Sequence, residues 1–427
     1  MNTLKLLLIC LFLSGAFLLR GEILKDARGV PVRYAGKYSN APVHLPSLRH
    51  KSVQFRAVWC AVVNNLDFPR CAAEAEFKKH FSAVIAQLRR HRCNVLIFQV
   101  RANGDAVYRS RYNPFSRWIS GTEDFFPGSF DPLPYMVQEC RRNGIEFHAW
   151  LNPYRITGST PLSKQKYLKS LSPRHLARLR PDLVLASRTK NGTWALQYDP
   201  GRPEVINHIL HTVLEIISKA PVDAIHFDDY FYPYDQLPEA ADRSTFRRYN
   251  PKALSLADWR RGNVNALVSQ VSRLCRSRGV RFGISPFGIW ANAKDRKGGS
   301  LTAGMQSRET IYADSLLWLQ KGYLDYIIPQ IYWPFSHARA AYAAVTDWWI
   351  MAVRRFPGTA LYIGHGLYNI SARELFNQLR YNSAHREIRG EALYSLRHLK
   401  NKTISNMLQN TWRVPVPSGS VTYTQGN

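Results

Sequence analysis

Eight short apolar segments recur along this chain of 427 residues, and a helical pattern separates most of them from the next. Their side chains are apolar almost without alternation, which is typical of strands buried on both faces of a parallel sheet. Strands that alternate with helices in this way indicate repeated βαβ units. The expected strands are residues 55–63, 94–100, 145–151, 222–227, 281–286, 326–331, 360–364 and 387–394.

The helical segments between them show apolar residues on one face, as Phe77, Phe81 and Leu88 do in the first. Eight strands separated by helices predict an α/β chain folded as a single enlarged (β/α)8 TIM barrel. An open doubly wound sheet is the alternative, but no GxGxxG motif follows an early strand. The expected helices are residues 74–92, 133–142, 203–219, 254–278, 312–321, 338–355 and 372–379.

The predicted barrel covers residues 53–415, between an N-terminal arm (22–52) and a C-terminal tail (416–427). Residues 1–21 have the pattern of a secretory signal peptide, with Lys5, an apolar run over residues 6–13 and small residues at 14–16. This pattern predicts an exported protein, periplasmic or extracellular, without a stable membrane span after cleavage. An uncleaved anchor is the alternative, because apolar residues resume at 17–19.

The chain is strongly basic: 58 Lys and Arg against 30 Asp and Glu give a net charge of +28. Such a positive charge attracts nucleic acid, anionic membranes or acidic wall polymers. The alternative is that the proteins of the source organism are generally basic, in which case the charge indicates no partner. A hydrophobic fraction of 45% excludes a disordered chain. Five cysteines follow the signal segment without a CxxC pair or a zinc-ligand spacing, so we interpret them as buried apolar residues and expect no metal. A single disulfide, formed in an oxidising compartment, is the alternative.

Barrel enzymes carry their sites at the carboxyl ends of the strands, and the fourth strand ends here in Asp228-Asp229. Like charges crowded in a cleft raise one pKa, which provides a proton donor at neutral pH. His226 shares a strand face with Asp228, because neighbouring side chains alternate. A loop-capping or ion-paired role for the two carboxyls is the alternative.

Aromatic and polar side chains end the other strands, whereas the strands behind them are apolar. Five aromatic rings at strand ends favour a carbohydrate groove, although a single Trp more often packs in a core. Arg and Asn side chains there could bind hydroxyl or carboxylate groups. The candidate substrate-binding residues are Trp59, Arg101, Trp150, Asn152, Tyr154, Arg155, His226, Tyr230, Trp290, Gln330, Tyr332 and Trp333.

Several strand ends form specific strings, among them HAWLNPYR at residues 148–155, HFDDYFYP at 226–233 and ISPFGIW at 284–290. Together with QVR at 99–101 and YIIPQIYW at 326–333, they resemble the bacterial glycosyl hydrolase-like 10 family from about residue 53 to about residue 415. The resemblance implies a TIM barrel, an exported bacterial protein and hydrolysis of a polysaccharide. Cell-wall glycan of the peptidoglycan type is the substrate class that it suggests.

A glycosidase needs an acid for the leaving oxygen and a nucleophile or base. We expect Asp228 to be the central carboxylate and Asp229 its neighbour. Since adjacent residues rarely reach across a glycosidic bond, Asp105 after the second strand is the first choice for the second acid. Residues 223–228 also loosely echo the chitinase-type barrel, where the substrate's N-acetyl group is the nucleophile, but the terminal acid of that pattern falls at Tyr230.

The sequence thus predicts an exported glycoside hydrolase that acts on an amino-sugar cell-wall glycan without a cofactor. A glycan-binding barrel without catalysis is the alternative from another class. Binding of nucleic acid follows from the charge alone, and the predicted barrel and export signal argue against it.

Overall fold

The computed structural model describes residues 21–123 and 128–418. The predicted signal peptide lies outside the described residues apart from residue 21, and so does the predicted tail beyond residue 418.

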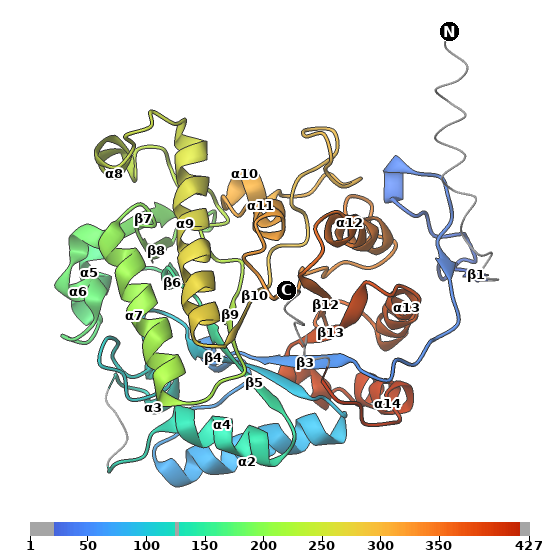
Figure 1. Ribbon diagram of the computed structural model, residues 1–427, viewed down its shortest axis with the longest axis horizontal. Coiled ribbons are helices and arrows are strands. Elements are labelled where there is room, and N and C mark those ends of the chain that lie inside the picture. The colour runs from blue at the N-terminus through green and yellow to red at the C-terminus, as the bar shows by residue number, and fades with distance from the viewer. Residues whose placement is uncertain (1–20, 124–127, 419–427) are drawn as a thin grey trace.

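Eight parallel strands close into a barrel in chain order, which confirms the predicted TIM barrel (Figure 1). Each of the eight expected segments contains or overlaps one strand of the barrel. Seven of the eight strands are buried along their whole length or all but one residue, as their apolar sequences require. The strands are β3 (Phe55–Cys60), β4 (Val95–Arg101), β5 (Glu146–Leu151), β9 (Ala224–Phe227), β10 (Arg281–Ile284), β11 (Tyr326–Ile327), β12 (Ala360–Gly366) and β13 (Ile388–Tyr394).

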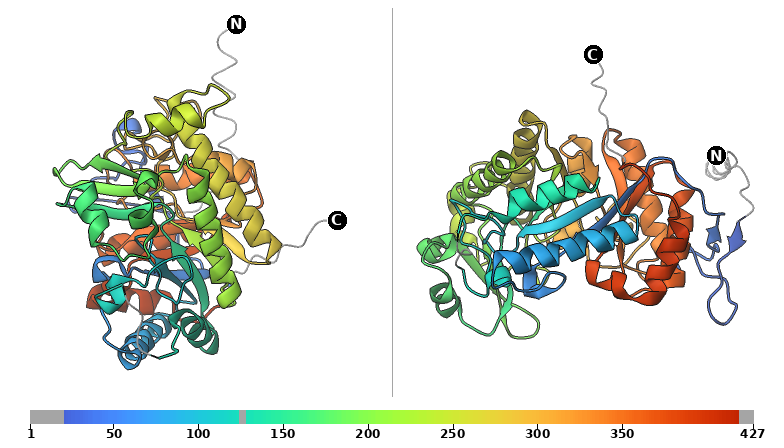
Figure 2. Two further views of the ribbon diagram at one scale, coloured as in Figure 1. Left: turned by 90° about the vertical axis from the view of Figure 1, so that its left-hand side faces the viewer. Right: turned by 90° about the horizontal axis from the view of Figure 1, so that it is seen from below.

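The major helices surround the barrel (Figure 2). Side-chain oxygens satisfy free backbone N–H groups at several helix starts: Ser255 accepts from Asp258 at the start of α9, and Ser371 accepts from Glu374 at the start of α13. One of the major helices was not expected from the sequence: α14, which follows the last strand. The helices are α2 (Glu74–Arg90), α4 (Pro132–Arg142), α7 (Pro203–Lys219), α9 (Leu256–Ser277), α11 (Ser315–Gln320), α12 (Tyr342–Arg355), α13 (Ala372–Ser383) and α14 (Lys402–Thr411).

A second sheet fills the long excursion between β5 and α7. It is antiparallel with the order β6-β8-β7, and its strands are β6 (Arg155–Thr160), β7 (Val184–Arg188) and β8 (Trp194–Tyr198). The same excursion contains the short helices α5 (Lys164–Ser170) and α6 (Leu176–Leu179). Three further short helices lie in loops of the barrel: α3 (Arg117–Ser120), α8 (Arg243–Arg248) and α10 (Ser307–Thr310).

The N-terminal arm forms a small antiparallel pair, β1 (Glu22–Ile23) with β2 (His44–Leu45). The arm is held against the barrel helices, because the hydroxyl of Tyr34 donates a 2.8 Å hydrogen bond to Asp347 of α12. Among residues 21–123 and 128–418, no helix combines the length and the apolar character that crossing a membrane requires. The five cysteines after the signal segment are free and buried, as their sequence context predicts.

Aromatic rings fill the barrel interior near the amino ends of the strands. Phe55 stacks on Tyr362 with ring centroids 3.8 Å apart, and Tyr326 lies 5.7 Å from Tyr362. Glycine makes room for this layer. A Cβ atom at Gly390 in β13 would lie 2.0 Å from the backbone oxygen of Phe55, and one at Gly283 in β10 would lie 2.1 Å from the Tyr326 ring.

We expect Gly390→Ala to lower the free energy of unfolding by about 2–3 kcal/mol, because the added methyl group must displace the backbone of β3. The matched control is Gly262→Ala in the exposed face of α9, where a Cβ atom meets nothing within 4 Å. It should gain about 0.5–1 kcal/mol from helix propensity. Urea unfolding followed by circular dichroism compares the two. Equal stabilities would contradict the close approach of β13 to β3.

Candidate active site

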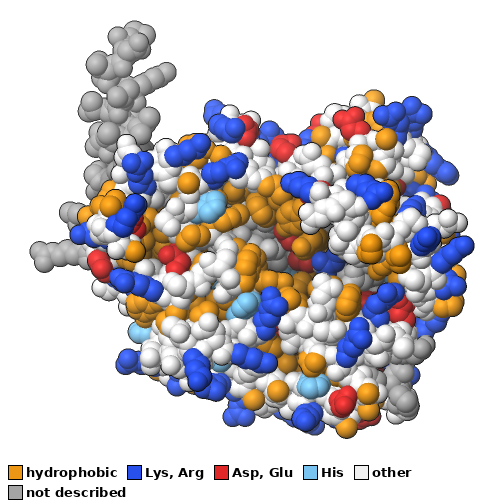
Figure 3. Space-filling model, turned by 180° about the vertical axis from the view of Figure 1, so that it is seen from behind, with side chains coloured by type: hydrophobic (Ala, Val, Ile, Leu, Met, Phe, Trp, Pro, Cys, Tyr) orange, Lys and Arg blue, Asp and Glu red, His pale blue; other side chains and the backbone are white. Residues whose placement is uncertain are grey.

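A pocket of about 780 Å³ opens at the carboxyl ends of the barrel strands. The face of the molecule shown in Figure 3 is hollowed near its middle, where apolar side chains surround acidic ones. Asp228 and Asp229 lie in the lining, directly after β9, and both are almost fully buried by their neighbours (4% and 1% exposed). Since barrel strands run in one direction, the loop after β9 delivers both carboxyls to this end.

Three donors hold the Asp228 carboxylate. The indole N–H of Trp150 donates to Oδ2 at 3.1 Å, the side-chain amide of Asn152 donates to the same oxygen, and the backbone N–H of Tyr230 donates to Oδ1 at 3.2 Å. Trp150 and Asn152 come from the end of β5, which pairs with β9 in the barrel. Hydrogen bonds to the charged form favour ionised Asp228.

The amide of Asn152 is oriented by residues behind it. Gln99 of β4 accepts two backbone N–H groups at its Oε1 (Val62 and Val63, both 3.0 Å), so its NH2 group faces Asn152 and donates to Oδ1 at 2.6 Å. Arg155 donates to the same Oδ1 at 2.7 Å. With its oxygen engaged twice, Asn152 turns its own NH2 group toward Asp228.

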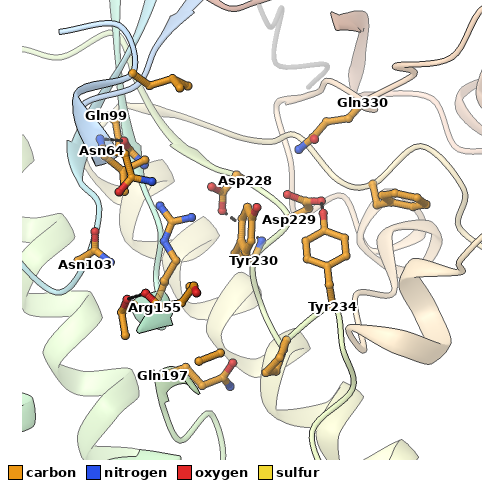
Figure 4. A pocket seen from close by; sticks show the side chains of 18 of the residues that line it. Asn64, Gln99, Asn103, Arg155, Gln197, Asp228, Asp229, Tyr230, Tyr234 and Gln330 are labelled. Atoms are coloured by element: carbon orange, nitrogen blue, oxygen red, sulfur yellow. Dashed lines mark hydrogen bonds between the residues drawn. The ribbon is translucent and has the colours of Figure 1, made fainter. Parts of the chain in front are cut away.

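Asp229 lies beside Asp228 and receives the hydroxyl hydrogen bond of Tyr234 (Figure 4). Burial and the negative charge of Asp228 raise the pKa of Asp229 to about 8, against the opposing effect of the Gln330 amide. Burial also raises the pKa of Asp228, and Arg155 and the three donors oppose that rise. The pair therefore holds one proton near neutral pH, and the balance of donors places it on Asp229.

The walls of the pocket combine rings with small polar groups. Trp59 contributes a ring from β3, and the barrel loops contribute the rings of Trp118, Phe287, Trp333 and Tyr368. The antiparallel sheet and the turn after β7 contribute a mostly polar wall, with Ala195 and Leu196 beside Thr157, Gly158, Ser159, Ser187, Thr189 and Gln197. The guanidinium of Arg155 lies 4.7 Å from the ring centroid of Tyr230. Rings beside hydrogen-bonding groups suit a sugar chain, which has apolar C–H faces and polar edges.

The pocket brings together most of the candidate residues. Asn152 is fully buried behind the floor and acts on the pocket through Asp228. The lining contains Trp59, Trp150, Arg155, Asp228, Asp229, Tyr230, Gln330, Tyr332 and Trp333.

Asp105, the first choice for a second acid, lies outside the pocket lining. Its carboxylate accepts the backbone N–H groups of Ala102 (3.0 Å) and Asn103 (2.9 Å) and the hydroxyl of Ser116 (2.6 Å). These bonds close the loop after β4 and hold the Asp105 carboxyl outside the lining, where it does not join Asp228 and Asp229.

Arg101 and Tyr154 also lie outside the lining, although we expected them to bind substrate. The buried guanidinium of Arg101 donates to the backbone oxygens of Asn152 (2.7 Å) and Pro153 (3.0 Å), so it supports the loop after β5. Tyr154 is fully buried in the hydrophobic core.

His226 and Trp290 are the other two candidates outside the lining. His226 points into the barrel, where it contacts the hydroxyls of Tyr326 (3.1 Å) and Ser285 (3.0 Å), and burial lowers its pKa well below the ordinary value. Trp290 stacks on Trp348 with centroids 5.7 Å apart and donates to Asp314 at 2.8 Å.

The candidate set lacked several residues that the structure places at the site. Gln99 carries a signal, because it is polar within an otherwise apolar strand, and Tyr394 carries one as the end of the eighth strand. Apart from Arg155 of β6, the residues of the antiparallel sheet carry no such signal, since short polar strands resemble a loop. Within the described parts of the chain, no group of three His, Cys, Asp or Glu side chains is arranged to hold a metal ion.

Residues 54–382 match the family described as Glycosyl hydrolase-like 10. The chain belongs to this family. Glycosyl hydrolase YngK of Bacillus subtilis (strain 168) is 37% identical over 368 residues, which are 82% of this chain and 70% of that protein. Glycosyl hydrolase DigH of Escherichia coli (strain K12) is 34% identical over 396 residues, 86% of this chain and 89% of that protein.

Among solved structures, the catalytic domain of β-amylase from Paenibacillus polymyxa matches with a TM-score of 0.54 and 11% identity over 84% of this chain and 98% of that chain. At this identity the likeness shows the shared fold alone. The chain spans less than half the length of some other solved glycosidases that it matches. Family and fold together identify the chain as a glycoside hydrolase with a TIM barrel.

We expect Asp229→Asn to gain stability over the wild type as pH rises from about 4, the ordinary value for Asp, to about 8. A carboxyl whose folded pKa is raised keeps its proton in the folded chain after the unfolded chain has lost it, so wild-type stability falls through this window. The asparagine variant lacks this loss, which is on the order of a few kcal/mol. Urea unfolding at a series of pH values measures the difference, and a difference that does not vary with pH would contradict the raised pKa.

Proposed function

We propose that this protein is an exported glycosidase that cleaves an amino-sugar glycan strand of the bacterial cell wall. One observation carries the proposal: two consecutive carboxyls, of which Asp228 accepts three N–H groups while burial and the charge of Asp228 raise the pKa of Asp229, lie at the floor of a pocket with aromatic and polar walls. A carbohydrate chain fits such walls. Hydrolysis of a glycosidic bond requires a carboxylic acid that protonates the leaving oxygen and a second carboxylate nearby.

We assign each carboxyl its own task. Asp229 retains a proton because it is buried beside a negative charge, so it can protonate the leaving glycosidic oxygen. Asp228 remains ionised because Trp150, Asn152 and the Tyr230 backbone bind its charge, so it can stabilise positive charge that develops on the sugar ring. In this assignment, activity declines as pH rises through about 8, where Asp229 loses its proton.

The net charge of +28 supports a wall polymer as substrate. Wall material is anionic, and a basic protein concentrates on it by long-range attraction that added salt weakens. The signal-peptide pattern of residues 1–21 supports export to the compartment where such a polymer occurs.

We expect Asp228→Asn to reduce release of oligosaccharides from peptide-free wall glycan strands by about a thousandfold or more, because the fixed charge at the floor is lost. Its thermal midpoint should stay within about 5 °C of the wild type, since an isosteric amide replaces the side chain. Chromatography of the released sugars measures the first effect and circular dichroism the second.

Asp105→Asn is the matched control, because Asp105 is equally buried but supports a loop. It should retain cleavage per folded molecule within about threefold of the wild type, since its carboxyl does not reach the pocket. Retained turnover in Asp228→Asn would remove Asp228 from the mechanism. Binding of strands by the wild type without any product would favour a non-catalytic glycan-binding barrel.

A further inference from the structure

We propose that the nucleophile at this site is the 2-acetamido group of the substrate itself, with Asp228 as the acceptor of its N–H and Asp229 as the acid. The inference rests on the proposed function. It narrows the substrate to strands whose cleaved sugar carries an N-acetyl group at C2.

The carboxyls available in the pocket support this arrangement. Among the described residues that line it, Asp228, Asp229 and Asp235 carry a carboxyl. Asp235 lies in the loop beyond Tyr234, where it accepts the backbone N–H of Lys190 at 3.1 Å and pairs with its ammonium at 3.8 Å. The floor therefore offers two carboxyls to the reacting carbon.

Other acids around the mouth are engaged in loop structure. Asp67 accepts the backbone N–H groups of Ala61 (2.9 Å) and Arg397 (2.8 Å) and the hydroxyl of Ser395 (2.7 Å). Asp105 is tied in the same manner after β4. Neither residue lines the pocket, so neither is placed to act as a nucleophile or base on a bound sugar.

The two floor carboxyls come from consecutive residues directly after β9, so a single loop supplies both of them. A conventional pair places its carboxyls on either side of the bond that breaks, about 5–5.5 Å apart for retention and about 6.5–9.5 Å for inversion. Cα atoms of neighbouring residues lie about 3.8 Å apart, and the charge of Asp228 acts directly on Asp229. One loop can supply an acid and an adjacent acceptor, while attack from the opposite side must come from elsewhere.

The Asp228 carboxylate accepts three hydrogen bonds and has room for one more. A carboxylate has about four lone-pair positions, and Trp150, Asn152 and the Tyr230 backbone occupy three of them. Both donors from β5 bind Oδ2, so the remaining position is on Oδ1. One N–H of a substrate amide would complete this shell and turn the amide oxygen toward the anomeric carbon.

The lining also contains a site for the acetyl methyl group. Trp59 and Tyr394 meet edge to face with centroids 6.1 Å apart, and Tyr394 stacks on Tyr332 at 5.8 Å. These three rings line the pocket next to the acid pair, since the charge of Asp228 contributes to raising the pKa of both tyrosines, after burial. A methyl group against such rings is removed from water.

The reaction balances with these groups alone. The acetamido oxygen bonds to C1 as the bond from C1 to the glycosidic oxygen breaks, and Asp229 gives its proton to that oxygen. The resulting oxazolinium ring holds its N–H against Asp228. Water then attacks C1 and passes a proton to Asp229, and the ring opens to restore the acetamido group. One water molecule is consumed, and two inversions at C1 retain its configuration.

The substrate test uses peptide-free wall glycan strands that are chemically N-deacetylated and then re-acylated with either acetyl or trifluoroacetyl groups. Both products carry neutral amides, but the trifluoroacetyl oxygen is a poorer nucleophile. We expect the wild-type kcat to fall about tenfold or more for the trifluoroacetyl strands with KM within about threefold, and proton NMR to show the retained anomer first. An equal kcat on both strands, an inverted product, or a glycosyl adduct on Asp228 in mass spectrometry would overturn the inference while leaving the glycosidase function in place.

A binding test separates the inference from turnover. The thiazoline of N-acetylglucosamine mimics the oxazolinium ring, and calorimetry should show it binding the wild type about a hundredfold or more tighter than N-acetylglucosamine does. Asp228→Asn should lose this preference, and Asp105→Asn should keep it. Equal affinity for the two sugars would overturn the inference. Absence of cleavage on every wall glycan would instead overturn the proposed function.

Discussion

Two negative charges cannot be held side by side in a space that water hardly reaches, and the site of this protein depends on that constraint. Asp228 and Asp229 follow β9 without a residue between them, and both are almost completely buried. The donors around them are unequal: three N–H groups bind Asp228, while Asp229 has the Tyr234 hydroxyl and the Gln330 amide. Because of this asymmetry, the single proton of the pair resides on Asp229 and Asp228 stays ionised. Two chemically identical groups thus become an acid beside a base.

The barrel makes this costly arrangement stable. Buried carboxyls persist where a rigid frame fixes their donors, and the frame here is the end of three neighbouring strands. Gln99 of β4 orients Asn152 after β5, and Asn152 binds Asp228 after β9. Since β4, β5 and β9 are hydrogen-bonded side by side, the closure of the barrel itself sets the distances in this network. The antiparallel sheet adds a polar wall without disturbing that frame.

The sequence predicts the barrel well because its strands are buried on both faces, which leaves near-continuous apolar runs such as residues 94–100. It also locates the acid pair, since carboxyls directly after an apolar strand lie at the mouth of a barrel. It does not distinguish a side chain that reaches the pocket from one that turns into the core. Arg101, Tyr154 and Trp290 lie at or after strand ends as Trp150 and Gln330 do, yet tertiary packing decides which way each of them points. Asp105 illustrates the same limit, because a loop-closing carboxylate and a catalytic one have the same sequence signature.

The position of a single proton tests most directly whether Asp229 is the acid and Asp228 the ionised carboxylate of this pocket. Neutron diffraction from deuterium-exchanged crystals near pH 6.5, below the pKa of about 8 for Asp229, locates that proton. We expect a deuterium atom on a carboxyl oxygen of Asp229, and a bare Asp228 that accepts from Trp150, Asn152 and the Tyr230 backbone. Two bare carboxylates, or a deuterium atom on Asp228, would contradict the division of roles on which the site depends.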